Sequence, residues 1–423
     1  RHSAISMMKD YFYTKAPGVG GRLKKRAFDF IVKEITPTGK KCEILAFNKE
    51  DGSKNYIEKN WPDPTGQEQL VLTLEKFNTD LNFAIRFMCR GMHLSPKRIG
   101  YAGMKDKRAV SSQRISIWKP DYEKVKNFTN RSLSLRDAEW SDKRVELGDL
   151  QGNEFEITLR EIELDEKETK KRITQCMAEI EKGIPNFFGQ QRFGGVREIT
   201  HLVGRELVKG NVESAVMLYL TATAPEEDEE TKNARQKLAA ARDFADASKF
   251  FPPQLRFERA IIHHLCKYPR DFAGSLGMLP KYLRIMFTHA YQSHLFNRVI
   301  AWRLEEGLGL EPVEGDILID GIPTAPLFGF ESEFAQGKMG EIEKRALEEE
   351  GIELKDFKLK VLSELSSKGK RKSLALSPKN LRIKEVGKDE LTDGSTKAVV
   401  EFFLSKGNYA TTVIREIMKK EPR

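Results

Sequence analysis

Strand-like sequence lies at both ends of this chain of 423 residues, and a long helical stretch separates the two ends. Residues 27–35 and 68–77 alternate apolar and polar side chains, as half-buried strands do. Residues 199–306 are mainly helical, and strand patterns return at 381–386 and 397–404. This order predicts an α+β fold in which C-terminal strands complete the sheet begun at the N-terminus, around an inserted domain.

The chain is too long for one typical domain, so it should divide. We expect a first part over residues 1–198, an inserted α/β domain over 199–372 and a C-terminal return over 373–423. Residues 366–372 read as an exposed connector before the return. The sheet shared by the first and last parts should be mixed and mainly antiparallel.

Composition favours a soluble globular protein, with 39% hydrophobic and 32% charged residues. No run of 18 apolar residues occurs, so no membrane span is expected. The N-terminus lacks the apolar core of a secretion signal, and a cytoplasmic location is expected. The formal charge is +9, and basic residues cluster at 22–26, 105–108 and 368–372. Such clusters suit a nucleic acid, although each alone could be a solvated basic surface.

Cysteine usage gives no sign of a disulfide framework or a zinc site. The four cysteines are scattered without a CxxC pair, which suits a reducing compartment. Cys89 and Cys176 fall on apolar helix faces and are expected to be small core residues. Adjacent His263 and His264 point to different helix faces and make a poor metal pair.

The stretch from Gly100 to Gln113 reads GYAGMKDKRAVSSQ. Its glycines allow tight turns, and Asp106 stands among three cations whose charge favours the ionised carboxylate. An ionised aspartate can act as a nucleophile, a base or a cation ligand. Residues 110–118 alternate as a strand, so Asp106 should lie on a loop that leads into it. The local residues alone favour a charged hairpin turn in solvent, since turns select Gly and Asp for purely local reasons.

Several kinds of chemistry lack their motifs. The sequence contains no GxxxxGK[ST] and no GxGxxG between a strand and a helix, so a nucleotide cofactor is not expected. GxSxG and HExxH are absent as well. A reaction run by one carboxylate without a cofactor remains the leading catalytic interpretation.

The Gly100–Gln113 stretch resembles the signature of the TruD family of transfer-RNA pseudouridine synthases, with Ser111 or Ser112 in place of the usual threonine. Five further phrases resemble the family in the family's order, over nearly the whole chain: RLKKRAFDFIVKE, LGDLQGNEFEITLR, IPNFFGQQRFG, AYQSHLFNRVIAWRL and KGNYATTVIREIM. The length and the insert are more similar to archaeal members than to bacterial ones.

The resemblance implies a pseudouridine-synthase-like catalytic domain interrupted by a TRUD domain. It implies isomerisation of a uridine in transfer RNA to pseudouridine, typically at position 13, without a cofactor or a metal. Asp106 is then the nucleophile, attacking either the base or C1′ of the ribose. Transfer RNA is the expected partner and a monomer the expected state, although the sequence leaves the oligomeric state open.

Three further site residues follow from the resemblance. Phe30 matches a substrate-contacting phenylalanine, although a strand core residue would look the same. Lys24 could hold Asp106 ionised or contact phosphate, or it could be a solvated cation. The amide of Asn153 suits the uracil edge or the ribose, although asparagine is common in turns.

The remaining assignments concern two rings and one amide. Phe155 shares a strand face with Asn153 and fits a base-stacking ring, with core packing as the alternative. Tyr409 matches a position that is often phenylalanine in bacterial members. Gln113 could orient the loop or the RNA. The rings at Phe187, Phe188 and Phe193 are assigned to packing.

Two other classes of function stay open at this point. A non-catalytic RNA-binding or RNA-remodelling protein could use the same scaffold, but a degenerate member would be expected to lose the acid or the aromatic residues. A metal-dependent nuclease would need several carboxylates converging on Asp106, and none are close to it in sequence.

Overall fold

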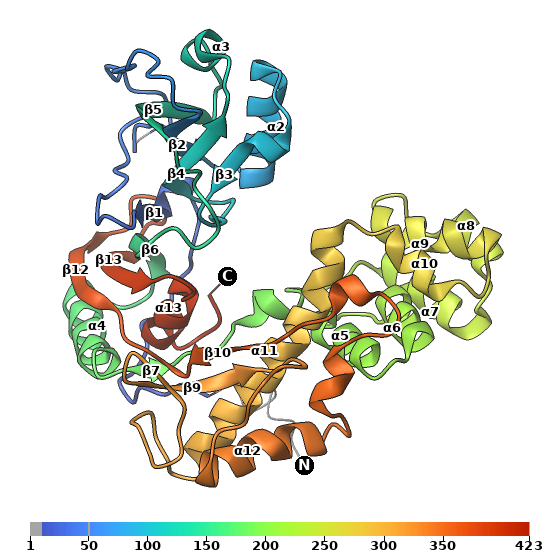
Figure 1. The fold of residues 1–423 in the computed structure, drawn as a ribbon. Coiled ribbons are helices and arrows are strands. Elements are labelled where there is room, and N and C mark those ends of the chain that lie inside the picture. The colour runs from blue at the N-terminus through green and yellow to red at the C-terminus, as the bar shows by residue number, and fades with distance from the viewer. Residues whose placement is uncertain (1–10, 50, 423) are drawn as a thin grey trace. The chain divides into compact units, whose positions relative to one another are not determined.

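The computed structural model describes residues 11–49 and 51–422, which divide into two compact units (Figure 1). Unit 1 is Pro185–Leu376, and unit 2 is Phe12–Ile184 with the stretch from Ser377 onward. The predicted boundaries lay at 198/199 and 372/373, so residues 185–198 and 373–376 group with the helical unit in this division. The functions assigned to the two domains stay predictions.

Unit 2 is built on one large mixed sheet with strand order β12-β13-β6-β1-β4-β2-β5, and β3 pairs with β4. The pairing of β1 with β4 is parallel, and the other pairings along this order are antiparallel. β13 pairs with β6, so the C-terminal strands join the N-terminal sheet as expected. The strands are β1 (Phe30–Ile35), β2 (Gln69–Phe77), β3 (Ile99–Tyr101), β4 (Val110–Trp118), β5 (Leu133–Ser141), β6 (Gly152–Ile162), β12 (Lys379–Lys388) and β13 (Thr396–Ser405).

The sheet of unit 2 is covered by helices whose apolar faces were visible in the sequence. α2 buries its apolar residues in a core with β2, β4 and β5. The side chain of Asp80 caps this helix by accepting a hydrogen bond from the backbone N of Phe83. α4 packs against β12 and β13, and α13 contacts α4. The helices are η1 (Ala27–Asp29), α2 (Leu81–Met92), η2 (Pro96–Arg98), α3 (Tyr122–Lys126), α4 (Glu166–Ile180) and α13 (Ala410–Met418).

The Asp51-Gly52 pair is typical of a hairpin turn, but the hairpin around it is only partly formed. Phe47 and Lys54 make a single isolated bridge, and no strand extends from it on either side among the described residues. The buried carboxylate of Glu75 accepts the backbone N–H groups of Leu45 and Ala46. These donors are thereby satisfied by a side chain on β2, not by a partner strand. Glu50 lies outside the described residues.

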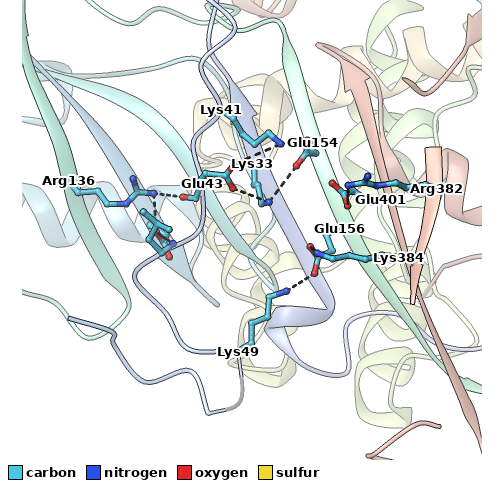
Figure 2. A network of polar contacts seen from close by, with 12 residues as sticks. Lys33, Lys41, Glu43, Lys49, Arg136, Glu154, Glu156, Arg382, Lys384 and Glu401 are labelled. Atoms are coloured by element: carbon cyan, nitrogen blue, oxygen red, sulfur yellow. Dashed lines mark hydrogen bonds and ion pairs between the residues drawn. The ribbon is translucent and has the colours of Figure 1, made fainter. Parts of the chain in front are cut away.

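One face of the sheet carries a network of ion pairs (Figure 2). Lys33 on β1 contacts Glu43 and Glu154, and Glu156 on β6 receives Lys49 and Lys384. Burial alone would raise the pKa of Glu156, but the two lysines hold it below its usual value. The segment that follows β1 is thereby fastened to the sheet. Because side chains alternate along a strand, Phe30, Asn153 and Phe155 lie on the opposite face.

Unit 1 packs its helices around the long helix α11, which runs beside α5. Phe188 and Phe193 lie in this core and Phe187 packs against it, so the packing role predicted for these rings is confirmed. The helices are η3 (Gln190–Phe193), α5 (Thr200–Val208), α6 (Val212–Thr221), α7 (Glu229–Ala241), α8 (Phe244–Phe250), α9 (Arg256–Lys267), α10 (Phe272–Gly277), α11 (Lys281–Glu305), α12 (Gly337–Glu348), η4 (Leu354–Phe357) and η5 (Ser363–Leu365).

A small sheet completes unit 1, with order β10-β9-β8. Lys370–Ser373, which the sequence suggested was a connector, is strand β10 and pairs with β9. The guanidinium of Arg371 binds the fully buried carboxylate of Glu343, which explains why so basic a segment is ordered in a sheet. The short strands of unit 1 are β8 (Leu318–Ile319), β9 (Ile322–Leu327), β10 (Lys370–Ser373) and β11 (Ala375–Leu376), and β7 (Ile184–Pro185) contains the chain boundary between the units.

All four cysteines are free thiols. Cys176 is buried and Cys89 packs half-buried against the core, in line with the predicted core roles. Within the described ranges, no helix combines the length and the apolar character needed to cross a bilayer.

Unit 1 also contains two stacked imidazoles. The rings of His201 and His294 lie 4.9 Å apart, and the Nδ1 atom of each has no hydrogen-bond partner among the described residues. Burial and then the charge of Arg205 lower the pKa of His201 to about 4. Burial, followed by His201 and nearby arginines, lowers the pKa of His294 to about 3. The folded protein therefore holds both rings neutral at pH 7.

We expect unit 1 to lose stability as the pH falls below about 6.5. The unfolded chain takes up protons there, whereas the folded chain resists them down to about pH 4 and 3, so the free energy of unfolding drops across this window. His294→Phe should flatten this dependence, whereas His263→Asn, at an exposed position, should not. Hydrogen exchange of α5 and α11 between pH 7 and 4 measures the effect. Equal pH slopes in all three proteins would contradict it.

Candidate active site

Asp106 lies on the loop of residues 102–109 between β3 and β4, as predicted; we call this segment the Asp106 loop. The neighbouring Lys105 points inward and pairs with Glu34 of β1 at 2.6 Å, with both side chains buried. Gln113 of β4 donates from Nε2 to the carbonyl of Gly103 at 3.0 Å. These two anchors hold the loop on the sheet and leave the Asp106 side chain 40% exposed.

The cation in contact with Asp106 is Lys24. Its Nζ donates to Oδ1 of Asp106 at 2.8 Å and lies 4.1 Å from the centre of the Phe30 ring. The backbone of Lys24 has φ of 55°, an uncommon conformation for a residue with a side chain and a frequent feature of functional sites. Lys105 is bound to Glu34 and Arg108 to the carbonyl of Lys25. The ion-pair partner of Asp106 is therefore Lys24, which is distant in sequence, and not Lys105 or Arg108.

A row of aromatic rings lies beneath this ion pair. Phe30 meets Phe155 edge to face at 6.1 Å, and Phe155 stacks on Phe402 of β13 at 5.6 Å. Phe30 is 1% and Phe155 is 6% exposed. Both rings therefore serve as core packing in this structure, and the ammonium of Lys24 covers Phe30. Their predicted contact with substrate remains a prediction.

Asn153 stands beside the aromatic row with an unused acceptor. It precedes Phe155 by two residues on β6 and pairs with Glu34 across the strands. Its Oδ1 is buried and makes no hydrogen bond among the described residues. Gln113 shows the same pattern, since its Oε1 is unpartnered while its Nε2 holds the Asp106 loop. A buried acceptor without a donor is costly, and a bound ligand could supply the donor.

Two turns lie at this edge of the sheet, and the first of them is hydrogen-bonded to the Asp106 loop. In the turn before β6, Gly148 donates from its backbone N to the carbonyl of Ala102 at 2.8 Å. The turn after β13 is tied to the same place, because Lys406 donates from Nζ to the carbonyl of Gly148 at 2.9 Å. Tyr409 follows that second turn, begins α13 and is 44% exposed. Of the predicted aromatic residues, Tyr409 offers the most accessible ring.

Close approach of the backbones explains the glycine before Asn153. A Cβ atom at Gly152 would lie 2.1 Å from the carbonyl oxygen of Leu404, so only glycine lets β6 and β13 meet here. Of the two adjacent residues, Gly152 is therefore required for steric reasons, and Asn153 supplies an unpartnered acceptor.

Sequence reasoning missed two residues of this region. Phe402 sits in the alternating phrase KAVVEFFL, and its inward register could have shown that it packs on Phe155. Lys76 ends an apolar alternation and is fully buried, donating to the carbonyl of Thr79. Burial and then Lys105 lower the pKa of Lys76 to about 8, against the opposing effect of Asp80 and Asp106. In the sequence, Lys76 occupies a position on an otherwise apolar strand face, and this pattern could have identified it as a buried lysine.

Unit 2 has a cavity that does not involve Asp106. This cavity of about 420 Å³ is lined by residues of the charged network and β13, including Lys41, Glu154 and Arg382, and its lining does not include Asp106. In the part of the chain that the structure describes, no three His, Cys, Asp or Glu side chains gather where they could hold a metal ion.

Comparisons with known proteins agree with this arrangement. The sequence profile of the family described as tRNA pseudouridine synthase D (TruD) matches residues 6–321 and 319–417. A relative from Methanococcoides burtonii, named "Probable tRNA pseudouridine synthase D", is 40% identical over 98% of this chain and 96% of its own. A relative of the same name from Methanosarcina acetivorans is 41% identical over 97% of this chain and 95% of its own.

A solved structure extends the agreement to three dimensions. The crystal structure of a candidate tRNA pseudouridine synthase D (TruD) from Methanosarcina mazei superposes with a TM-score of 0.76 at 38% identity, covering 98% of this chain and 97% of that one. The fold and these matches define a pseudouridine synthase built on a mixed sheet. This chain belongs to the TruD family of tRNA pseudouridine synthases.

Lys24→Met should impair turnover far more than stability. The pair with Asp106 is partly exposed, so its loss should change the free energy of unfolding by less than about 1 kcal/mol. A carboxylate that is no longer oriented can lose roughly 100-fold in rate. Single-turnover pseudouridine formation and urea denaturation measure the two quantities.

Two matched variants complete this test. Lys24→Arg keeps a cation beside Asp106 and should recover part of the rate, whereas Lys25→Met, which removes an ion pair with Glu161, should leave the rate near that of the wild type. An unchanged rate in Lys24→Met would contradict the positioning role.

Proposed function

We propose that this protein converts a uridine of transfer RNA to pseudouridine with Asp106 as the nucleophile. The observation that carries the proposal is the ion pair of Asp106 with Lys24 on a loop anchored to the sheet. The ammonium favours the ionised carboxylate, which is the reactive form of this nucleophile. Membership of the family supplies the reaction class.

The reaction is an isomerisation whose atoms balance without a co-reactant. The bond between N1 of the uracil and C1′ of the ribose breaks, the base rotates, and C5 bonds to C1′. The proton on C5 leaves and N1 gains one. The carboxylate of Asp106 can form its covalent bond either to the base or to C1′, and both paths give the same product.

Recognition of the base is assigned to the residues around Asp106. An enzyme acting on a nucleotide within a folded RNA must extract the base from its stack and hold it. The unpartnered Oδ1 of Asn153 suits the N3–H of uracil, and the exposed ring of Tyr409 suits its face. Phe30 contributes by supporting Lys24, and Phe155 contributes by packing against Phe30. These two rings contact the base only if the site opens further.

We propose position 13 of transfer RNA as the site of modification, in line with the family resemblance. The alternative is an RNA-binding or RNA-remodelling protein without catalysis. Such a protein would have no use for an anchored loop that presents an aspartate against a lysine.

Asp106→Asn should bind transfer RNA and form no pseudouridine. The amide has the same shape, and the anchors at Lys105 and Gln113 stay in place, but the nucleophile is gone. The measurement is a site-resolved pseudouridine assay on unmodified transfer RNA, without added cofactor, with the wild type in parallel.

The outcomes separate the two functions. Product from the wild type alone, at one position, supports the enzyme and its nucleophile. Full activity in Asp106→Asn would overturn the role of Asp106. Tight binding by both proteins without product from either would favour the remodelling alternative.

A further inference from the structure

The outer face of α2 carries an exposed aromatic and basic stripe. Phe83, Arg86, Phe87 and Arg90 follow one another at helical spacing, and all four are exposed. The two rings are 47% and 41% exposed, their centres lie 6.4 Å apart, and Arg86 stacks 4.7 Å from the Phe83 ring. We call these four residues the α2 stripe. Figure 1 shows α2 beside β3, which leads into the Asp106 loop.

The charge of the α2 stripe is unbalanced. α2 contains two arginines and no acid, and neither arginine forms an ion pair among the described residues. The basic clusters predicted to contact RNA differ, because most of their cations are paired within the protein: Arg22 and Lys25 with Glu161, Arg26 with Glu390, Lys24 with Asp106, Lys105 with Glu34, Lys368 with Glu331 and Arg371 with Glu343. The α2 stripe is therefore a basic surface that no carboxylate neutralises.

Structural roles account for only part of this face. Arg90 stands in the last turn of the helix, where a cation offsets the helix dipole. That reason does not apply to Arg86 in mid-helix. Core packing does not explain the rings either, since the opposite face of α2, from Leu81 to Met92, fills the core. Two phenylalanines side by side in water lower solubility, so their exposure indicates a binding surface.

We propose that the α2 stripe binds an unpaired stretch of the RNA substrate, apart from the nucleotide that reacts at Asp106. Bases stack on exposed aromatic rings, and arginines hold the phosphates between them. A-form duplex offers no such bases to a helix, so the occupant is single-stranded. The inference rests on the proposed function only for the identity of the RNA.

The binding test uses the full chain with Asp106→Asn, so that no product forms, and one unmodified transfer RNA over a salt series. Arg86→Gln with Arg90→Gln removes two phosphate contacts and should raise Kd and lower the salt slope by about 1.4, since each contact to a single strand contributes about 0.7. Phe83→Leu with Phe87→Leu keeps apolar helix formers but removes the rings, and should weaken binding at least about tenfold. Phe83→Tyr with Phe87→Tyr keeps the rings and should bind nearly as tightly as the parent.

A charge-matched control lies on another helix of unit 2. Lys167→Gln with Lys170→Gln removes two exposed cations from α4 and should change Kd by less than about twofold, because α4 is not part of the proposed RNA contact and only cations that contact phosphates contribute strongly to affinity. An equal loss of RNA affinity in this control would show that the arginines act only through the net charge of the protein, and it would overturn the proposal. Unchanged affinity in the Leu variant would also overturn it, because stacking would then play no part.

Turnover with Asp106 intact separates this inference from the proposed function. The α2 variants should raise KM, and a fall in the single-turnover rate at saturating enzyme with unchanged Kd would contradict the binding role. If the wild type forms no pseudouridine, the proposed function fails, while loss of RNA binding in the ring and arginine variants would still support the α2 stripe. Circular dichroism and urea denaturation verify that each variant is folded.

Discussion

The arrangement of the active site depends on the buried ion pair between Lys105 and Glu34. A buried ammonium that loses its partner costs about 3–5 kcal/mol, so Lys105 is fixed on β1 and its neighbour Asp106 is held at the surface. The same carboxylate accepts the backbone N of Arg114 at 3.0 Å, which ties β1 to β4. A reactive group on a loop thereby acquires the rigidity of the sheet.

The two faces of that sheet have different structural roles. On one face, lysines and glutamates in alternation fasten the segment after β1, and nearly every charge meets its opposite (Figure 2). On the other, aromatic packing supports the lysine that orients Asp106. On α2, Arg86 and Arg90 form no ion pair among the described residues and lie beside exposed rings. These two cations are therefore available to a polyanion.

Much of this could be predicted from sequence, for reasons that differ between residues. Asp106 and its loop were found because turn glycines and the following strand are local signals. The partner of Asp106 was not, since Lys24 lies 82 residues away and only the family resemblance named it. The stacking of Phe402 on Phe155 depends on strand register, and the boundaries near Pro185 depend on which core Phe188 enters. Long-range contacts of this kind produce no periodic pattern in the sequence from which they could be predicted.

Inserting unit 1 into the chain has a consequence for biosynthesis. β6 leaves the ribosome early with β1 as one neighbour, but its other neighbour, β13, is made only after all of unit 1. The contiguous unit can complete its core while the interrupted one still exposes a row of unpaired backbone groups, a known hazard for aggregation. Nascent chains of this protein therefore pass through a stage in which the site-bearing unit has an open sheet edge, and translation speed across unit 1 sets how long that stage lasts.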